Sequence, residues 1–109
     1  MKTYIGTYHQ QGNTVVVQES GRERRLSPKV NIRNHSPSGF SWGYGGSGPA
    51  QLALAIMCDL YGDRIEDHPV NYQTFKFAFV ANLPESKPWR ATEAEVRQAV
   101  ARLTDGAPR

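Results

Sequence analysis

The sequence predicts an α+β fold, in which roughly three or four N-terminal strands form a small antiparallel sheet that packs against about three C-terminal helices. Strand-like alternation occupies the first part of the chain, and the most apolar segment, Leu52–Cys58, follows it. This order, strands first and helices afterwards, is typical of α+β chains. A length of 109 residues predicts a single domain over 1–109, with mainly strands and loop in 1–45 and mainly helices in 46–109.

Two strands and a turn are predicted at the N-terminus. Tyr4, Gly6 and Tyr8 alternate with other residues, and 15–17 is a run of valines, both of which are typical of strands. The sequence QQGN between them has the residues of a turn. A short third strand is expected at RERRL, residues 22–26, and a segment with two Ser-Pro steps follows as loop.

The sequence GFSWGYG, residues 39–45, predicts one more strand. Its period of two would point Phe40, Trp42 and Tyr44 to one face and glycine or serine to the other. Small residues on one face of a strand allow a neighbouring element to approach closely. We therefore expect a helix to pack on the glycine side.

The first predicted helix covers residues 49–61. Proline is favoured at the first helical position, where Pro49 stands, and Gly48 suits the cap before it. Gln51 lies three residues after Gly48, as in half of a capping box. Apolar residues on nearly all sides predict burial, and Gly62 stands where a C-terminal cap belongs.

Two further helices are predicted downstream. The second covers 70–82, with Phe75 and Phe79 on the buried stripe and with Gln73 and Lys76 facing solvent. The third begins at the sequence TEAE, which is a capping box. Its expected buried residues are Val96, Ala99, Val100 and Leu103.

Charge, cysteine content and hydropathy indicate where the protein acts and which partners it can have. The net charge is +3, and residues 1–45 hold six basic against two acidic side chains, so the positive potential belongs to the N-terminal part. The lone cysteine, Cys58, lies in an apolar run and is expected to be buried and unreactive. The N-terminus lacks the apolar segment of a signal peptide, and no run is long enough to span a bilayer. We expect a cytoplasmic protein without a membrane partner.

The glycine-rich corner before the first helix has two interpretations. Gly43, Gly45 and Gly48 match the dinucleotide pattern G-x-G-x-x-G formally, but the βαβ context of that pattern is absent, and Pro49 has no amide for a phosphate. The favoured interpretation is a tight corner that needs positive φ angles and close packing. A surface anion site is the alternative. No cofactor is predicted.

The segment RNHSPSG places His35 beside two serines, which raises the question of nucleophilic catalysis. A catalytic triad needs an acid that orients the histidine, and no aspartate lies between Met1 and Ala50. A loop whose side chains bond their own backbone is favoured, and a binding role is the alternative. No catalytic residue and no metal site is predicted, because His9 and His68 are isolated.

Two charged segments are candidate docking surfaces. The connection after the first helix carries Asp59, Asp63, Glu66 and Asp67, which we expect to be solvated. The basic hairpin offers arginines near aromatic rings, an arrangement that also suits single-stranded nucleic acid. The candidate binding residues are Arg22, Arg24, Arg25, Lys29, Arg33, His35, Trp42 and Tyr44.

The stretch N-H-S-P-x-G-F-x-W-G-Y-G-G-S-G-P-A-Q-L-A-L-A, from Asn34 to Ala55, resembles domain-of-unknown-function family 6166. The similarity extends to Y-Q-x-F-K at Tyr72–Lys76, to LPE at Leu83–Glu85 and to TEAE at Thr92. The resemblance implies a short bacterial protein of the kind that phages, plasmids and other mobile elements carry. It implies no activity, catalytic residue or cofactor.

Two hypotheses of function follow. The first is a non-enzymatic interaction protein of a phage or mobile element that binds a host or phage protein, for instance as a counter-defence (anti-CRISPR-type) inhibitor of a host complex. The alternative is a nucleic-acid-binding accessory domain that uses the basic hairpin. A weaker third option is an enzyme built on His35 and the glycine-rich corner. The sequence leaves the identity of the partner and the oligomeric state open.

Overall fold

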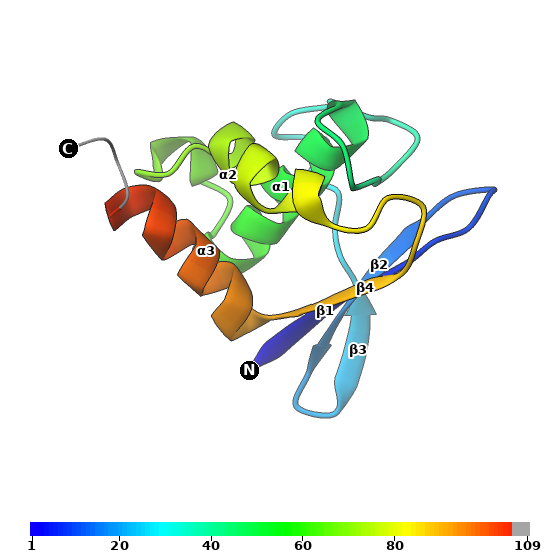
Figure 1. Cartoon of the computed structure of the whole chain (residues 1–109). Coiled ribbons are helices and arrows are strands. Elements are labelled where there is room, and N and C mark those ends of the chain that lie inside the picture. Colours follow the sequence, from blue (N-terminus) through cyan, green and yellow to red (C-terminus); the bar gives the residue numbers. More distant parts are fainter. Residues whose placement is uncertain (106–109) are drawn as a thin grey trace.

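The computed structural model describes residues 1–105 and has an α+β architecture, as predicted (Figure 1). Four antiparallel strands form one sheet in the order β3-β2-β1-β4. The strands are β1 (Lys2–Thr7), β2 (Thr14–Glu19), β3 (Arg22–Arg25) and β4 (Trp89–Thr92). Three of them are the predicted N-terminal strands, whereas the fourth comes from the C-terminal half of the chain.

The helices follow the first three strands. They are α1 (Ser47–Tyr61), η1 (Ile65–Asp67), α2 (Tyr72–Ala78), η2 (Val80–Asn82) and α3 (Glu93–Asp105). Helix α1 ends at Gly62, whose amide donates to the Cys58 carbonyl at 2.8 Å and whose φ of 97° favours glycine. The predicted second helix is broken into α2 and the short η2. No helix of residues 1–105 combines the length and the apolar character that a bilayer crossing requires.

The capping box at the start of α3 is confirmed. The Glu95 amide donates to the Thr92 hydroxyl, and the Thr92 amide donates to the Glu95 carboxylate, both at 3.1 Å. The reciprocal pair satisfies two amides that the first turn leaves without a partner. Helix α3 therefore begins directly at the end of β4.

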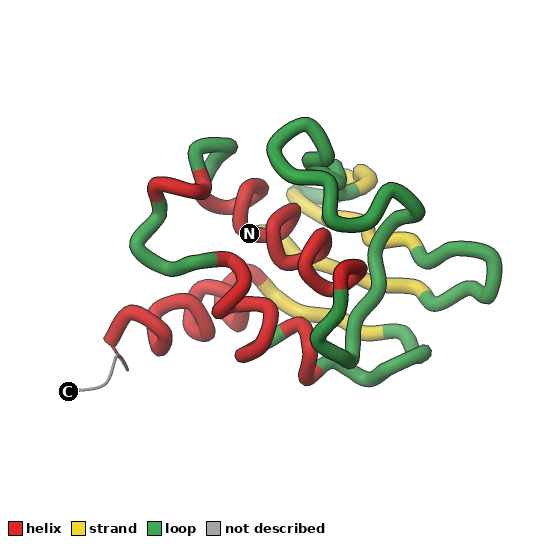
Figure 2. Tube along the Cα trace, turned by 90° about the horizontal axis from the view of Figure 1, so that it is seen from above, coloured by secondary structure: helices red, strands yellow, loops and turns green. Residues whose placement is uncertain are grey.

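The helices cover one face of the sheet, and the core lies between the two layers (Figures 1 and 2). The side chains of the sheet that point into this core are those of Tyr4, Val15, Val17, Trp89 and Ala91. Helix α1 is buried from Gly48 to Cys58, as its apolar composition predicts, and Cys58 is among the buried residues. The central position of α1 explains why it has almost no polar face.

The predicted strand over 39–45 is wrong. Gly39 and Gly43 have φ angles of 116° and 86°, which a strand does not accommodate. The rings do not share a face, because Trp42 is 2% exposed and Tyr44 is 44% exposed. The Gly43 amide donates to the Val80 carbonyl at 3.1 Å, so this segment packs on η2 instead of joining the sheet.

The fourth strand of the sheet is β4, which pairs with β1. Its alternation is visible in the sequence, since Trp89 and Ala91 are buried while Arg90 is exposed. The Trp89 ring lies across Gly6 on β1, where a Cβ atom would come within 2.1 Å of the indole nitrogen. This close approach explains the glycine in β1. Trp89 in turn packs edge-on against Trp42, with ring centroids 5.7 Å apart.

Two predicted side-chain roles in the helices are wrong. Gln51 does not complete a capping box but is fully buried and binds the backbone of the preceding loop. Lys76 does not face solvent, because it is only 7% exposed, whereas its neighbour Phe77 is 61% exposed. The Lys76 ammonium lies 4.0 Å from the centroid of the Phe77 ring. On α2, the aliphatic part of Lys76 is therefore buried, and the aromatic ring of Phe77 is exposed.

Candidate interaction surface

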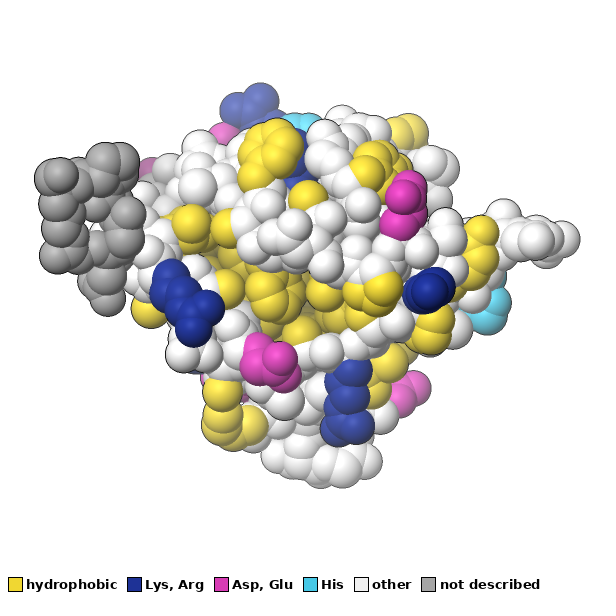
Figure 3. All heavy atoms as spheres, viewed as in Figure 1, with side chains coloured by type: hydrophobic (Ala, Val, Ile, Leu, Met, Phe, Trp, Pro, Cys, Tyr) yellow, Lys and Arg dark blue, Asp and Glu magenta, His cyan; other side chains and the backbone are white. Residues whose placement is uncertain are grey.

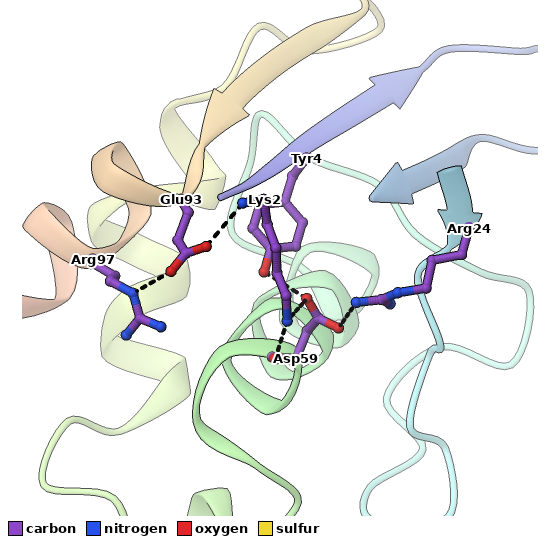
Figure 4. A network of polar contacts seen from close by, with 6 residues as sticks. All are labelled: Lys2, Tyr4, Arg24, Asp59, Glu93 and Arg97. Atoms are coloured by element: carbon purple, nitrogen blue, oxygen red, sulfur yellow. Dashed lines mark hydrogen bonds and ion pairs between the residues drawn. The ribbon is translucent and has the colours of Figure 1, made fainter. Parts of the chain in front are cut away.

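A polar cluster around Asp59 joins α1 to the sheet (Figure 4). The Tyr4 hydroxyl donates to the Asp59 carboxylate at 2.7 Å, Arg24 donates at 2.7 Å, and the Lys2 ammonium lies 3.2 Å from it. The expectation that Asp59 is solvated is wrong, because its side chain is 11% exposed. Asp59 was expected to be solvated because three more acids follow it in the sequence. The contacts with Tyr4 and Lys2 show instead that the last turn of α1 packs against β1.

The cluster shifts the pKa values of Asp59 and Tyr4. Burial alone would raise the pKa of Asp59, but the donors Tyr4, Arg24 and Lys2 outweigh it and lower that pKa. Burial, together with the carboxylate of Asp59, raises the pKa of Tyr4, so the phenol stays protonated and acts as a donor. The arrangement therefore stabilises the charged form of Asp59.

A second polar contact ties the N-terminus to α3. The Lys2 amide donates to Glu93 at 2.9 Å, and Arg97 donates to the same carboxylate at 2.8 Å (Figure 4). The hydrogen bond from the Lys2 backbone, together with Arg97, lowers the pKa of Glu93. Strand β1 is therefore held by polar groups of both α1 and α3.

Replacement of Asp59 by Asn is expected to flatten the dependence of stability on pH. A carboxyl whose folded pKa is lowered stabilises the fold above its unfolded pKa of about 4, and this stabilisation is lost as the pH falls through the folded pKa. The wild-type urea midpoint should therefore fall between pH 7 and about pH 3 more steeply than that of D59N. Asp67→Asn, which disrupts the exposed pair with Arg64, is the control and should keep the wild-type slope. Equal slopes for wild type and D59N would contradict a structural role of this charge.

Three of the five predicted basic binding residues form ion pairs within the chain. Besides Arg24 with Asp59, Lys29 pairs with Asp63 at 2.9 Å and Arg33 pairs with Glu66 at 3.0 Å. The acidic partners all belong to the end of α1 and the connection that follows it. The two charged segments, which were expected to be separate docking surfaces, thus neutralise each other in part through these three pairs.

The other two basic residues, Arg22 and Arg25, are exposed on the edge strand β3 and have no ion pair within residues 1–105. The hairpin therefore does not present a continuous stripe of free cations. An isolated pair of arginines gives a weaker attraction to a phosphate backbone than the predicted group of five.

His35 connects the loop before α1 to helices α1 and α2 through hydrogen bonds. Its backbone amide donates to the Gln51 side chain at 2.7 Å, and its Nε2 atom lies 2.6 Å from the Tyr72 hydroxyl. Burial raises the pKa of Tyr72, which favours the neutral phenol. Within residues 1–105 no carboxylate is hydrogen bonded to the His35 ring, so the structure lacks the orienting acid of a triad.

The glycine-rich corner is packed in part and open in part. A Cβ atom on Gly48 would lie 1.8 Å from the Ser41 hydroxyl, so close packing requires this glycine. Beside it, a hollow of about 350 Å³ at the N-terminus of α1 is lined by hydroxyl-bearing residues, among them Tyr8, Ser38 and Ser47. Polar side chains and the helix N-terminus suit water or an anion there. The anion interpretation stays a prediction.

The described part of the chain contains no cluster of side chains that could bind a metal ion. No group of three or more His, Cys, Asp or Glu side chains is gathered within residues 1–105. Cys58 is buried, and this burial raises its pKa to about 11, so its thiol stays protonated.

Two exposed rings flank bare backbone at the corner. The ring of Phe77 lies against Gly45, where a Cβ atom would be 2.8 Å from it, and the ring of Tyr44 lies over Gly46. We call the group of Tyr44, Gly45, Gly46 and Phe77 the ring surface. Figure 3 shows apolar side chains gathered over α2 and in the area between it and β4 and α3.

Tyr44 is among the predicted binding residues and Phe77 is not, although the sequence carries a signal for the exposure of Phe77. Phe75, Phe77 and Phe79 are spaced by two, and a helix cannot bury all three on one side. Phe75 and Phe79 stack with centroids 5.3 Å apart, which leaves Phe77 outside. Trp42, the other ring among the candidate binding residues, is buried and donates to the Lys87 carbonyl at 2.8 Å, so it supports the fold from within.

Comparison with known proteins identifies a family. No curated protein and no solved structure matches the chain. The model of a family of unknown function, DUF6166, matches residues 4–102, which is nearly all of the sequence. That span includes all four strands except the first residues of β1, all the helices before α3, and most of α3. The chain therefore belongs to DUF6166.

Proposed function

We propose that this chain is a non-enzymatic interaction protein that binds a partner protein through the ring surface. The observation that carries the proposal is the exposure of two aromatic rings that the fold holds in place. Exposed rings that keep one orientation lose little conformational freedom on binding, and aromatic anchors supply much of the binding energy at protein interfaces.

Both rings are fixed by specific contacts. The Tyr44 hydroxyl is hydrogen bonded to the Ser41 hydroxyl at 2.7 Å, and its ring rests on Gly46. Phe77 rests on Gly45 and carries the Lys76 ammonium over its face. Because Gly45 and Gly46 have no side chains, each ring can lie directly on the backbone beneath it.

The described chemistry favours binding over catalysis. His35 bonds a tyrosine instead of an acid, and the charged residues around Asp59 are paired with one another. Most of the stretch from Asn34 to Ala55 has an architectural role, through Trp42, Gly48 and Gln51. The parts of that stretch that face solvent around Tyr44 are then available for recognition.

A nucleic-acid-binding accessory domain is the alternative, and it has less support. Its predicted cations include Arg24, Lys29 and Arg33, all of which are paired with carboxylates. Trp42, which base stacking would need at the surface, is buried. A gel shift with a single-stranded oligonucleotide at low salt tests this alternative directly, and we expect no shift.

The double replacement Tyr44→Ala and Phe77→Ala is expected to abolish partner capture while leaving the fold intact. The chain is immobilised and incubated with lysate of a host bacterium, and the retained proteins are quantified by mass spectrometry. Loss of two aromatic anchors should reduce retention of the specific partner by about tenfold or more. Val30→Ala, which removes another exposed apolar side chain, is the matched control and should retain the partner.

Two results would contradict the ring surface as the binding site. One is equal retention of every captured protein by wild type and by Y44A/F77A. The other is the absence of any captured protein at all. Circular dichroism of both variants checks that the helices and the sheet persist, since the replaced side chains lie largely outside the core.

We further propose that the chain acts in the cytoplasm for a phage or mobile element, as a counter-defence inhibitor of the anti-CRISPR type that occupies a host protein complex. The chain is small, and its proposed site is a docking surface. Both properties suit an inhibitor that acts by binding to a host complex and blocking it. Cells with an active CRISPR system are challenged with a targeted phage, with and without the chain. Wild type should raise the plaque count and Y44A/F77A should not. An unchanged count with wild type would contradict the counter-defence role.

A further inference from the structure

The face of the sheet that points away from the helices carries an ordered row of side chains. The register pairs Ile5 with Val16 and with Arg90, and it pairs Val16 with Arg25. These four residues therefore cross the sheet from edge to edge in the order Arg90, Ile5, Val16 and Arg25. We call them the sheet row. The helices lie on the opposite face of the sheet (Figure 1).

The two arginines of the sheet row form no ion pair with the residues that the structure describes. Arg25 and Arg90 are exposed, and within the described residues the ion pairs are formed by other bases. An acid on the same face, Glu23, accepts a hydrogen bond from Gln18 at 3.1 Å. The row thus has two half-buried aliphatic side chains at its centre and an unpaired guanidinium at each end.

An apolar cleft opens beside Arg25, between the end of the β2–β3 pair and the loop that carries Phe40. It has a volume of about 310 Å³ and is lined by Val15, Leu26 and Phe40 as well as by Arg25 itself. Val15 and Leu26 are core residues whose edges reach the cleft. Arg25 belongs both to the sheet row and to the cleft, so a partner that passes Arg25 at the sheet edge could place an apolar side chain in the cleft.

The charge of the sheet row indicates which kind of molecule can bind to it. A second copy of the chain stacked by two-fold symmetry on the row would place arginine against arginine, because both ends carry the same charge. Bases of a nucleic acid would need rings to stack on, and the row has none. A protein segment with carboxylates at both ends and an apolar centre complements it in charge and in hydrophobicity.

We infer that the open sheet face binds an acidic segment of a partner protein. Carboxylates of the segment pair with Arg25 and Arg90, its apolar centre covers Ile5 and Val16, and an apolar side chain enters the neighbouring cleft. Three strand spacings separate the arginines at the backbone, about 14 Å, which sets the separation of the two acidic groups. The inference shares with the proposed function only the premise that the partner is a protein, since the ring surface consists of other residues.

Selection from a displayed library of random twelve-residue peptides on the immobilised full chain tests the inference. Enriched peptides should carry acidic residues on both sides of an apolar centre. Their affinity for R25Q/R90Q should fall by about tenfold or more. The control K87Q/R102Q removes the same charge from exposed positions elsewhere and should bind the peptides like wild type. The variant I5T/V16T keeps β-branched residues in the strands and should also bind more weakly.

Several outcomes would overturn the inference. These are the enrichment of no peptide, the enrichment of neutral or basic peptides, and equal binding of enriched peptides by wild type and R25Q/R90Q. Binding of a single-stranded oligonucleotide that R25Q/R90Q abolishes would assign the face to nucleic acid instead. Concentration-dependent dimerisation that I5T/V16T abolishes would assign it to self-association. Y44A/F77A should still bind the enriched peptides, so a failure here is distinguishable from a failure of the ring surface.

Discussion

Replacement of Gln51 by Leu is expected to lower the free energy of unfolding by about 3 kcal/mol, because it leaves several buried backbone groups without partners. The Gln51 side chain is fully buried in α1 and makes four hydrogen bonds to the preceding loop. It accepts from the amides of His35 and Ser36, and it donates to the carbonyls of Pro28 and Arg33. Leucine fits the volume of glutamine approximately but satisfies none of these groups.

Urea denaturation followed by circular dichroism measures this effect, and two further variants define its cause. Gln51→Glu keeps the acceptor but loses the donor amide and is expected to be destabilised as well, because a carboxylate would face two carbonyl oxygens. Gln98→Leu, on the exposed side of α3, makes the same chemical change in solvent and should alter stability by less than about 0.5 kcal/mol. A denaturation midpoint of Q51L equal to that of wild type would show that the loop does not depend on this side chain.

The role of Gln51 illustrates which parts of the structure the sequence could predict. Helices α1 and α3 and the β1–β2 hairpin were predicted correctly because their signals are local. The apolar run, the capping box at Thr92 and the turn at 10–13 each lie within a few residues of the element that they define. Gln51 was misassigned because its partners lie 15 to 23 residues earlier, and no local pattern distinguishes a cap from a tertiary contact.

The sheet was predicted only in part for a similar reason. Alternating residues at 39–45 satisfy the period of a strand, but the φ angles of Gly39 and Gly43 direct the chain into a turn. Strand β4 has only four residues and depends on β1, which lies far away in the sequence. A strand that short is stabilised by its partner instead of by its own propensity.

The ion pairs of the candidate binding residues could not be predicted from the sequence. Arg24 and Arg33 pair with acids that lie 35 and 33 residues further along the chain. Ion pairing across such distances depends on the packing of α1 against the sheet, which composition does not reveal. Phe77 was missed because the aromatic residues around it suggested one apolar stripe.

The distribution of charge now distinguishes the two faces of the molecule. On the helical side, carboxylates at the end of α1 neutralise Lys2, Arg24 and Lys29. On the open side of the sheet, Arg25 and Arg90 keep their charge exposed beside aliphatic residues. The exposed positive charge of this face thus comes from both halves of the chain, from Arg25 in residues 1–45 and from Arg90 in residues 46–109, and it would attract an acidic partner.

Replacement of Gly43 by Ala is expected to lower the free energy of unfolding by about 3 kcal/mol and to displace the ring surface. Its φ of 86° is unfavourable for alanine by about 1 kcal/mol or more. In addition, the new Cβ atom would lie 2.4 Å from the Glu85 Cα atom, a backbone clash that side-chain motion cannot relieve. Overpacking of this kind costs typically 1–3 kcal/mol. Relief of the clash would separate the segment of Tyr44 from η2.

Gly39→Ala is the matched control for this prediction. Gly39 has a φ of 116°, so alanine is strained there as well, but no atom lies within 4 Å of the added Cβ. We therefore expect G39A to lose only about 1 kcal/mol of stability, and the difference between the two variants measures the contact with Glu85. G43A should also fail to capture the partner, because the segment that carries Tyr44 would shift, whereas G39A should capture it. Equal stability of the two variants would mean that the corner yields to an added methyl group, and the close packing of Gly43 would then not hold the rings in place.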